Sequence, residues 1–186
     1  MQEKYAEALA ALERLKAGNR SYIGAERGGG DISPERRAKT SIEGQHPYAV
    51  IVGCSDSRVI PEHIFSAGIG ELFVIRVAGN VVDNIQLGSI EYAVEHLGCS
   101  LVLVLGHTGC GAVGAALEEH GGYVKYITDE IKCAIQKERD LVKASVKNVE
   151  HSVSKIRAQF MGKEGVLVTG ALYHTQSGVV DFDIGS

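Results

Sequence analysis

The sequence has no long apolar run and no excess of basic residues, and its first residues do not predict a secretory leader. Its 19 basic and 23 acidic residues give a formal net charge of -4, which argues against binding to nucleic acid or to an anionic membrane surface. The strongest apolar stretches, such as 101–105, are far too short to cross a bilayer. Residues 1–7 are polar, unlike a secretory signal. We therefore expect a cytoplasmic protein without a nucleic-acid or membrane partner.

The remaining composition is that of an ordinary globular protein. Hydrophobic residues make up 45% of the chain and charged residues 23%, values that indicate neither disorder nor a fibrous class. No internal repeat or low-complexity tract is visible. We expect residues 1–186 to form a single domain, with 1–45 as an N-terminal helical arm and 46–186 as an α/β core that includes a helical segment at 123–161.

The distribution of apolar residues predicts a mainly parallel sheet. Three short runs with little alternation predict strands buried on both faces: 49–53, 72–78 and 101–106. Helical segments lie between them, at 61–66 and 86–96. This alternation of strands and helices predicts parallel strands with right-handed crossovers. Residues 166–173 predict a fourth strand, and 179–182 a short antiparallel edge strand. The expected fold class is α/β, with helices flanking this sheet.

Three helices are predicted from apolar periodicity and capping residues. The first has an apolar face formed by Tyr5, Ala8, Leu9, Leu12 and Leu15, and Gly18 is expected to end it. A second should begin at Pro34 with Ser33 as its cap. Within 123–161, a narrow stripe consists of Val142, Val146, Val149, Val153 and Ile156. This stripe fits equally a helix packed on its own domain and a seam with another subunit.

The four cysteines differ in their position relative to the predicted strands. In a reducing compartment, cysteines indicate a metal or catalysis more than disulfides, although many are simply small buried residues. Cys54 directly follows the first predicted strand and His107 the third, so both should reach one edge of the sheet. Cys110 lies one helical turn after His107. Cys99 and Cys133 do not share this placement, and we expect both to be structural.

Two thiolates and one imidazole form a donor set that suits Zn²⁺. Three protein ligands leave one tetrahedral position open, as catalytic zinc sites do. Asp56 and Arg58 lie in the same loop as Cys54. A carboxylate there can orient a zinc-bound hydroxide, and an arginine can hold that carboxylate in place and ionised. The absence of a Cys-x-x-Cys motif argues against a redox protein.

These motifs resemble those of the β-class carbonic anhydrase family. The matching pieces are Gln45-x-Pro47, Cys54-Ser55-Asp56-Ser57-Arg58, the strand and loop 73–80, and Gly106-His107-Thr108-Gly109-Cys110-Gly111. The resemblance implies Cys54, His107 and Cys110 as ligands of one Zn²⁺ per chain, and Asp56 and Arg58 as a catalytic dyad. It also implies three contacts with substrate: Gln45, contributed across a dimer interface, Phe73 and Gly109.

The implied activity is the zinc-dependent, reversible hydration of carbon dioxide to bicarbonate and a proton by a zinc-bound hydroxide. Asp56 is expected to bind zinc only in a closed, inactive state that forms when Arg58 releases it. Two other functions remain open at this point: hydrolysis of carbon disulfide or carbonyl sulfide at the same site, and a non-catalytic zinc-binding scaffold. The family also implies a homodimer or homotetramer, which favours the intersubunit interpretation of the stripe within 123–161.

The chain departs from the family pattern at two positions. Val77 stands where many members have asparagine. Ile51 stands where one subclass has a tryptophan that helps to form a second, inhibitory bicarbonate site, and the sequence contains no tryptophan. We therefore do not expect that form of regulation.

Overall fold

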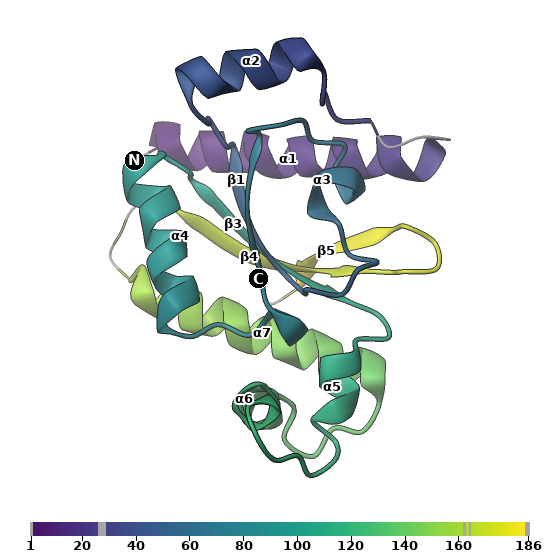
Figure 1. Cartoon of the computed structure of the whole chain (residues 1–186). Helices are drawn as coiled ribbons and strands as arrows, with labels where there is room; N and C mark the ends of the chain where they lie inside the picture. Colours follow the sequence, from purple (N-terminus) through teal and green to yellow (C-terminus); the bar gives the residue numbers. More distant parts are fainter. Residues whose placement is uncertain (1, 26–28, 162, 164, 185–186) are drawn as a thin grey trace.

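The computed structural model describes residues 2–25, 29–161, 163 and 165–184. In this part of the chain, five strands form one sheet: β1 (Ala49–Gly53), β2 (Leu72–Arg76), β3 (Leu101–His107), β4 (Leu167–Tyr173) and β5 (Val180–Ile184). The order is β2-β1-β3-β4-β5, with β5 antiparallel to β4 and the other neighbours parallel. The predicted fold class is confirmed (Figure 1).

Helices cover both faces of the sheet, which explains the near-continuous apolar strands. Helices α1 (Gln2–Gly24) and α3 (Pro61–Ile64) pack on one face, where Ile51 and Leu103 point. Helices α4 (Asn84–His96) and α7 (Leu141–Gln159) pack on the other face, against Val50 and Val104. Successive residues of β1 and β3 thus alternate between two separate cores.

The first helix does not end at Gly18, as the sequence analysis expected. It continues to Gly24, and the glycine at position 18 permits close packing instead of ending the helix. A Cβ there would lie 1.9 Å from the carbonyl oxygen of Phe65. The next residue, Asn19, is buried and donates a hydrogen bond to the carbonyl of Gly178, while its side-chain oxygen accepts one from the Val180 N–H. Together these contacts fix α1 against the sheet.

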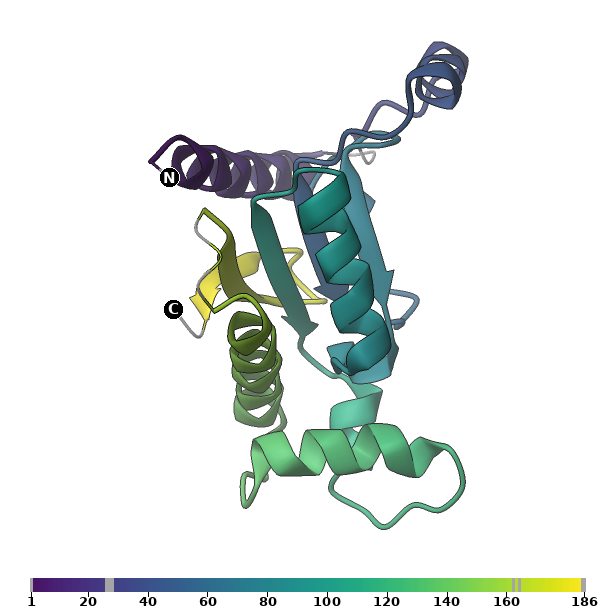
Figure 2. The ribbon, with the colours of Figure 1, turned by 90° about the vertical axis from the view of Figure 1, so that its left-hand side faces the viewer.

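The remaining helices lie at the two ends of the strands. Helix α2 (Pro34–Glu43) is capped by Ser33, as predicted, buries none of its residues and stands away from the body at the amino ends of the strands (Figure 2). At the carboxyl ends lie α5 (Gly111–Ala115) and α6 (Val124–Ile135). The predicted strand 72–78 stops at Arg76, and the chain turns into the short 3₁₀ helix η1 (Ala78–Asn80).

Helix α7 packs on its own sheet over most of its length. Val149, Val153 and Ile156 are fully buried within this chain, so the intersubunit interpretation of the stripe is wrong for these residues. Two strand glycines permit the close approach of α7 to the sheet. A Cβ at Gly106 would lie 2.4 Å from one methyl group of Val149, and a Cβ at Gly170 would lie 2.5 Å from the other. Two members of the stripe remain accessible: Val142, at 45% exposure, and the partly buried Val146.

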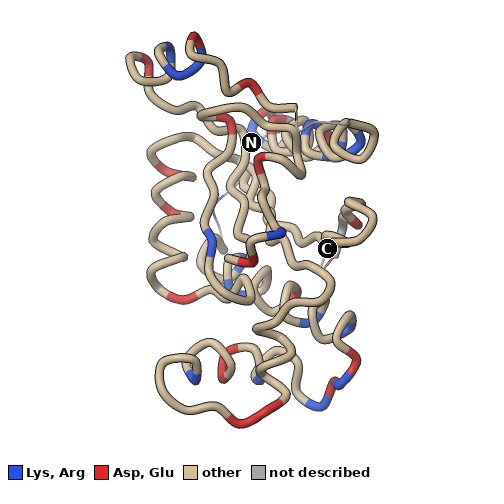
Figure 3. Tube along the Cα trace, turned by 45° about the vertical axis from the view of Figure 1, so that its right-hand side comes forward, with Lys and Arg blue, Asp and Glu red and all other residues tan. Residues whose placement is uncertain are grey.

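Charged residues of both signs are interspersed along the trace (Figure 3), in line with the formal net charge of -4. Among the described residues, none of the helices combines the length and the apolar character needed to cross a membrane.

We predict that Gly18→Ala destabilises the protein, because the added Cβ overlaps the Phe65 carbonyl, which belongs to the backbone and cannot rotate away. The free energy of unfolding should fall by about 1–3 kcal/mol in urea denaturation, as for an overpacked core. Gly24→Ala is the matched control, since a Cβ at the end of the same helix meets nothing within 4 Å. Equal stability of the two variants would contradict the packing role of Gly18.

Candidate metal centre

Three potential metal ligands meet at the carboxyl edge of the sheet. Strands β1 and β3 are parallel neighbours, with Gly53 opposite Leu105, so Cys54 and His107 emerge side by side. Cys110 follows in the short loop that leads into α5. The ligand atoms of Cys54, His107 and Cys110 all lie within 4.8 Å of one another, and each residue is at most 4% exposed. The structure therefore brings together the three residues that the sequence analysis selected.

The orientation of His107 leaves one ring nitrogen free for a ligand. Its Nδ1 lies 3.1 Å from the carbonyl oxygen of Thr108, and because a carbonyl can only accept, Nδ1 carries the proton. The other nitrogen, Nε2, is buried and has no hydrogen-bond partner among the described residues. A neutral imidazole with its free lone pair directed into a buried site is the form that binds metals.

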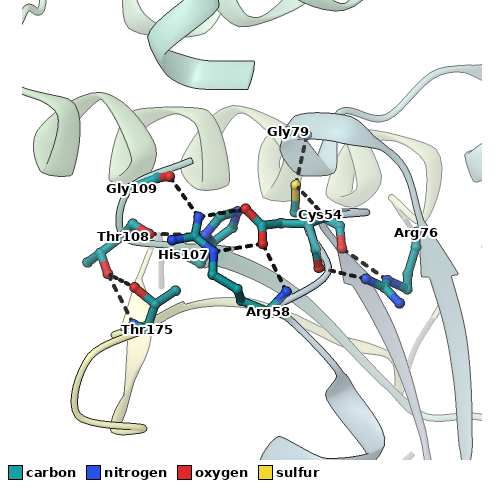
Figure 4. A network of polar contacts seen from close by, with 9 residues as sticks. Cys54, Arg58, Arg76, Gly79, His107, Thr108, Gly109 and Thr175 are labelled. Carbon is teal, nitrogen blue, oxygen red and sulfur yellow. Dashed lines mark hydrogen bonds and ion pairs between the residues drawn. The ribbon is translucent and has the colours of Figure 1, made fainter. Parts of the chain in front are cut away.

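The sulfur of Cys54 is surrounded by hydrogen-bond donors. The N–H of Gly79 lies 3.2 Å from it and the N–H of Asp56 3.4 Å (Figure 4). Hydrogen bonding from the Cys110 thiol lowers the pKa of Cys54, and the N–H groups of Asp56 and Gly79 lower it further. The same thiol pair raises the pKa of Cys110, because a second negative charge beside the first is unfavourable. A divalent cation would allow both sulfurs to ionise.

The donor set fits Zn²⁺. It consists of two sulfurs and an imidazole nitrogen, in a buried position, with that nitrogen otherwise unpaired. Borderline-soft cations prefer such ligands, whereas Mg²⁺ and Ca²⁺ prefer oxygen.

An ion pair lies at the solvent side of this cluster. Arg58 donates from Nε to Oδ1 of Asp56 at 2.9 Å and from Nη2 to Oδ2 at 2.7 Å. These bonds hold the pKa of Asp56 well below its usual range. Nη2 of Arg58 also donates to the carbonyl of Gly109 at 3.1 Å, which links the loop after β1 to the loop after β3 (Figure 4). Oδ2 of Asp56 lies 4.0 Å from Nε2 of His107.

Residues that the sequence analysis did not select hold these loops in place. Arg76 donates from Nε to the Cys54 carbonyl at 3.1 Å and from Nη2 to the Asp56 carbonyl at 2.8 Å. The hydroxyl of Thr108 accepts a hydrogen bond from the N–H of Thr175, which attaches the loop after β4. The sequence signal for Arg76 was weak: it lies two residues before the end of the predicted strand 72–78.

Two predicted substrate contacts lie away from this cluster within the chain. Gln45 precedes β1 and is exposed, at the opposite edge of the sheet from Cys54. Phe73 pairs with Val50 near the start of β2, three residues or roughly 10 Å before the strand ends. Its ring lies 6.2 Å from that of Tyr92. Gly109, the third predicted contact, does lie at the site.

The other two cysteines are separate from the cluster. Cys99 is buried, its thiol donates to the carbonyl of Pro47, and burial raises its pKa to about 11. Cys133 is exposed on α6.

Comparison with known proteins identifies the family. The carbonic anhydrase family model matches residues 49–180, a segment that contains all three candidate ligands together with Asp56 and Arg58. A carbonic anhydrase of Mycolicibacterium smegmatis is 36% identical over 190 residues, which cover 93% of this chain and 92% of that protein. The chain belongs to the β-class carbonic anhydrase family. The sequence-based recognition is thereby confirmed.

Other relatives agree with this assignment. Carbonic anhydrase 2 of Mycobacterium tuberculosis is 45% identical over 129 residues, which cover 66% of this chain but only 62% of that protein's length. The β-carbonic anhydrase CafA of Aspergillus fumigatus superimposes with a TM-score of 0.71 at 28% identity, covering 82% of this chain and 87% of that one. A tetrameric β-carbonic anhydrase of Sordaria macrospora gives 0.71 at 25% identity, with coverage of 80% and 86%.

We predict that bound metal protects Cys54 and Cys110 from alkylation. In the metal-loaded, folded protein only the exposed Cys133 should be alkylated readily. After a chelator removes the metal, Cys54 and Cys110 should be alkylated as well. Mass spectrometry of the digested protein measures the modification of each cysteine. Cys99 should stay unreactive under both conditions, because it is buried away from the cluster and its surroundings do not change when the metal leaves. Equal reactivity of Cys54 with and without chelator would contradict a metal at this cluster.

Proposed function

We propose that this chain is a zinc enzyme that catalyses the reversible hydration of carbon dioxide to bicarbonate and a proton, the general activity of its family. One observation carries the proposal: a buried cluster of two thiols and an imidazole lies directly beside a carboxylate that an arginine keeps ionised. A structural zinc site has no use for that carboxylate and would have a fourth protein ligand.

Cys54, His107 and Cys110 would hold one Zn²⁺ per chain and leave one position for a non-protein ligand. When bound, the metal supplies a Lewis acid that makes water a nucleophile near neutral pH. The protein's own residues supply the orientation of the nucleophile, a dry environment and the position of the substrate.

Asp56 orients the nucleophile. With its pKa held below the usual range, the carboxylate remains ionised at neutral pH and can only accept hydrogen bonds. It would therefore accept a hydrogen bond from the attacking oxygen, which directs a lone pair of that oxygen toward carbon dioxide. Arg58 donates two hydrogen bonds to the carboxylate of Asp56 and so fixes the orientation of its plane. The carboxylate can then accept a hydrogen bond from the nucleophile in only one direction.

Arg58 also keeps Asp56 away from the metal ligands. The carboxylate is only 4.0 Å from Nε2 of His107, so a small rotation would bring it into the cluster. We assign the closed, inactive state to this rotation, with Asp56 as the fourth ligand. The bond from Arg58 to the Gly109 carbonyl opposes it, because the guanidinium is anchored on the far side of the site.

An apolar wall surrounds the sulfurs. Apolar residues from the link between η1 and α4, from α5 and its C-cap, and from α6 and α7 form one buried cluster with Cys54 and Cys110. They are Val81, Val113, Ala116, Ile131, Ile135 and Ala144. Such surroundings suit an uncharged substrate such as carbon dioxide and strengthen electrostatic interactions within the site.

We also propose a homodimer or homotetramer with shared sites. Gln45 and Phe73 lie too far from the cluster of their own chain, so they could contact substrate only at the site of a neighbouring subunit. The tetrameric relative from Sordaria macrospora supports such an assembly. Gly109 would contact substrate at the site of its own chain. Reduced, metal-bound cysteines further favour a cytoplasmic location.

The test of this function is stopped-flow hydration of carbon dioxide together with metal analysis of the same sample. Zinc at one ion per chain and catalysis well above the buffer rate would support the proposal. Turnover of carbon disulfide and carbonyl sulfide should be measured in parallel. Faster turnover of either gas than of carbon dioxide would identify a different hydrolase, and a zinc-loaded protein without any turnover would identify a non-catalytic scaffold.

We predict that Asp56→Asn retains zinc but loses about 100-fold or more in kcat/KM, because the amide offers donors as well as an acceptor and no longer imposes one orientation. Ser57→Ala, a change at an exposed position of the same loop, is the control and should retain activity. The assigned role of Asp56 would be wrong if the asparagine variant were as active as the parent chain at neutral pH.

A further inference from the structure

The sulfur of Cys54 depends on a strained turn that lies outside the ligand motifs. Its shorter hydrogen bond comes from the N–H of Gly79, in η1. Gly79 has φ of 71° and Asn80 has φ of 46°, so two consecutive residues adopt the left-handed conformation. That conformation is unfavourable for a residue other than glycine, and it persists only when the surroundings hold it.

The support comes from helix α7, on the other side of the turn. Asn148 is 1% exposed, and its Nδ2 donates to the carbonyl of Gly79 at 2.7 Å. One turn later on the same helix, the hydroxyl of Ser152 donates to the carbonyl of Asn80 at 3.2 Å. Because the acceptor in the first contact is a carbonyl, the orientation of the Asn148 amide is determined. Gly79 is therefore held at its carbonyl by α7 and at its N–H by the Cys54 sulfur.

Simple packing does not explain an asparagine at this position. Its Oδ1 is buried and has no hydrogen-bond partner within the described part of the chain, which is unfavourable for stability. An apolar side chain of similar size would avoid that penalty but would leave the carbonyl of Gly79 without this donor. The amide therefore serves the Gly79 carbonyl, and through it the turn that contacts Cys54.

We propose that Asn148 is a positioning residue of the metal centre, which acts through Gly79 to keep the N–H of that residue directed at the Cys54 sulfur. The bond to the carbonyl restricts ψ of Gly79, and the turn then has one orientation relative to β1. This inference rests on the proposed metal site. Hydrogen-bonded residues behind a ligand commonly contribute about 10- to 100-fold to metal affinity.

The test uses Co²⁺ in place of zinc, because thiolate-to-cobalt charge transfer reports directly on the sulfur ligands. Asn148→Ala and Asn148→Leu both remove the donor, and the second nearly preserves the side-chain size. With the Gly79 amide no longer fixed, the Cys54 sulfur loses a hydrogen bond and gives up electron density more easily. We expect the charge-transfer band to move to lower energy and the affinity for Co²⁺, measured by chelator competition, to fall about tenfold.

Two variants on the same helix serve as controls. Ser154→Ala removes an exposed hydroxyl that bonds only within α7, to the carbonyl of Glu150, and leaves the turn untouched. Val153→Ala removes buried apolar contacts of α7 and reports what destabilisation of the helix alone does. Both should keep the parent spectrum and affinity, even where urea denaturation shows a loss of stability as large as that of the Asn148 variants.

The proposal is overturned if the Asn148 variants keep the parent band and affinity, or if Val153→Ala changes both to the same extent. A parent chain that binds Co²⁺ with thiolate bands but does not hydrate carbon dioxide would refute the proposed activity and leave this inference intact. A parent chain without such bands would remove the metal centre and the inference together.

Discussion

Two thiols and an imidazole meet in a buried position at the carboxyl edge of the sheet, and the rest of the site is arranged around this contact. Ionisation of both sulfurs is unfavourable unless a cation lies between them, because two adjacent negative charges repel each other. The fold supplies neutral amide donors to one sulfur and a neutral imidazole to complete the set. Metal binding and the local order of three chain segments are therefore expected to depend on each other.

The parallel sheet makes this convergence possible. Neighbouring strands β1 and β3 end at the same edge, so residues far apart in the sequence become adjacent without long loops. Helices on both faces fix the sheet, and strand glycines allow α7 to approach closely. This close packing brings Asn148 within hydrogen-bonding distance of the turn that contacts Cys54. The position of one ligand thus depends on packing along the whole length of the core.

The sequence was sufficient to predict the strands, the candidate ligands and the Asp56–Arg58 pair, because each has a local signature. A short apolar run predicts a strand, and a cysteine or histidine directly after it predicts where that side chain emerges. Residues that act on backbone groups left no such signature. Arg76 and Asn148 donate hydrogen bonds to backbone carbonyls that are distant in the sequence. Only the tertiary fold brings these donors and acceptors together.

Two errors have the same origin. Gly18 carries the local signal of a helix end, but its role comes from the distant carbonyl of Phe65. The apolar stripe of α7 has the same spacing whether it faces its own sheet or another subunit. Only the burial of its residues within the folded chain distinguishes these two arrangements.

The Asp56–Arg58 pair lies across the boundary between the site and the solvent. The side chain of Asp56 is 17% exposed, whereas that of Arg58 is 55% exposed. Dissolved anions can therefore approach the guanidinium from outside without passing the apolar wall around the sulfurs, and they compete with the carboxylate for it. Added salt is therefore expected to weaken the pairing of Arg58 with Asp56, and with it the fixed orientation of that carboxylate.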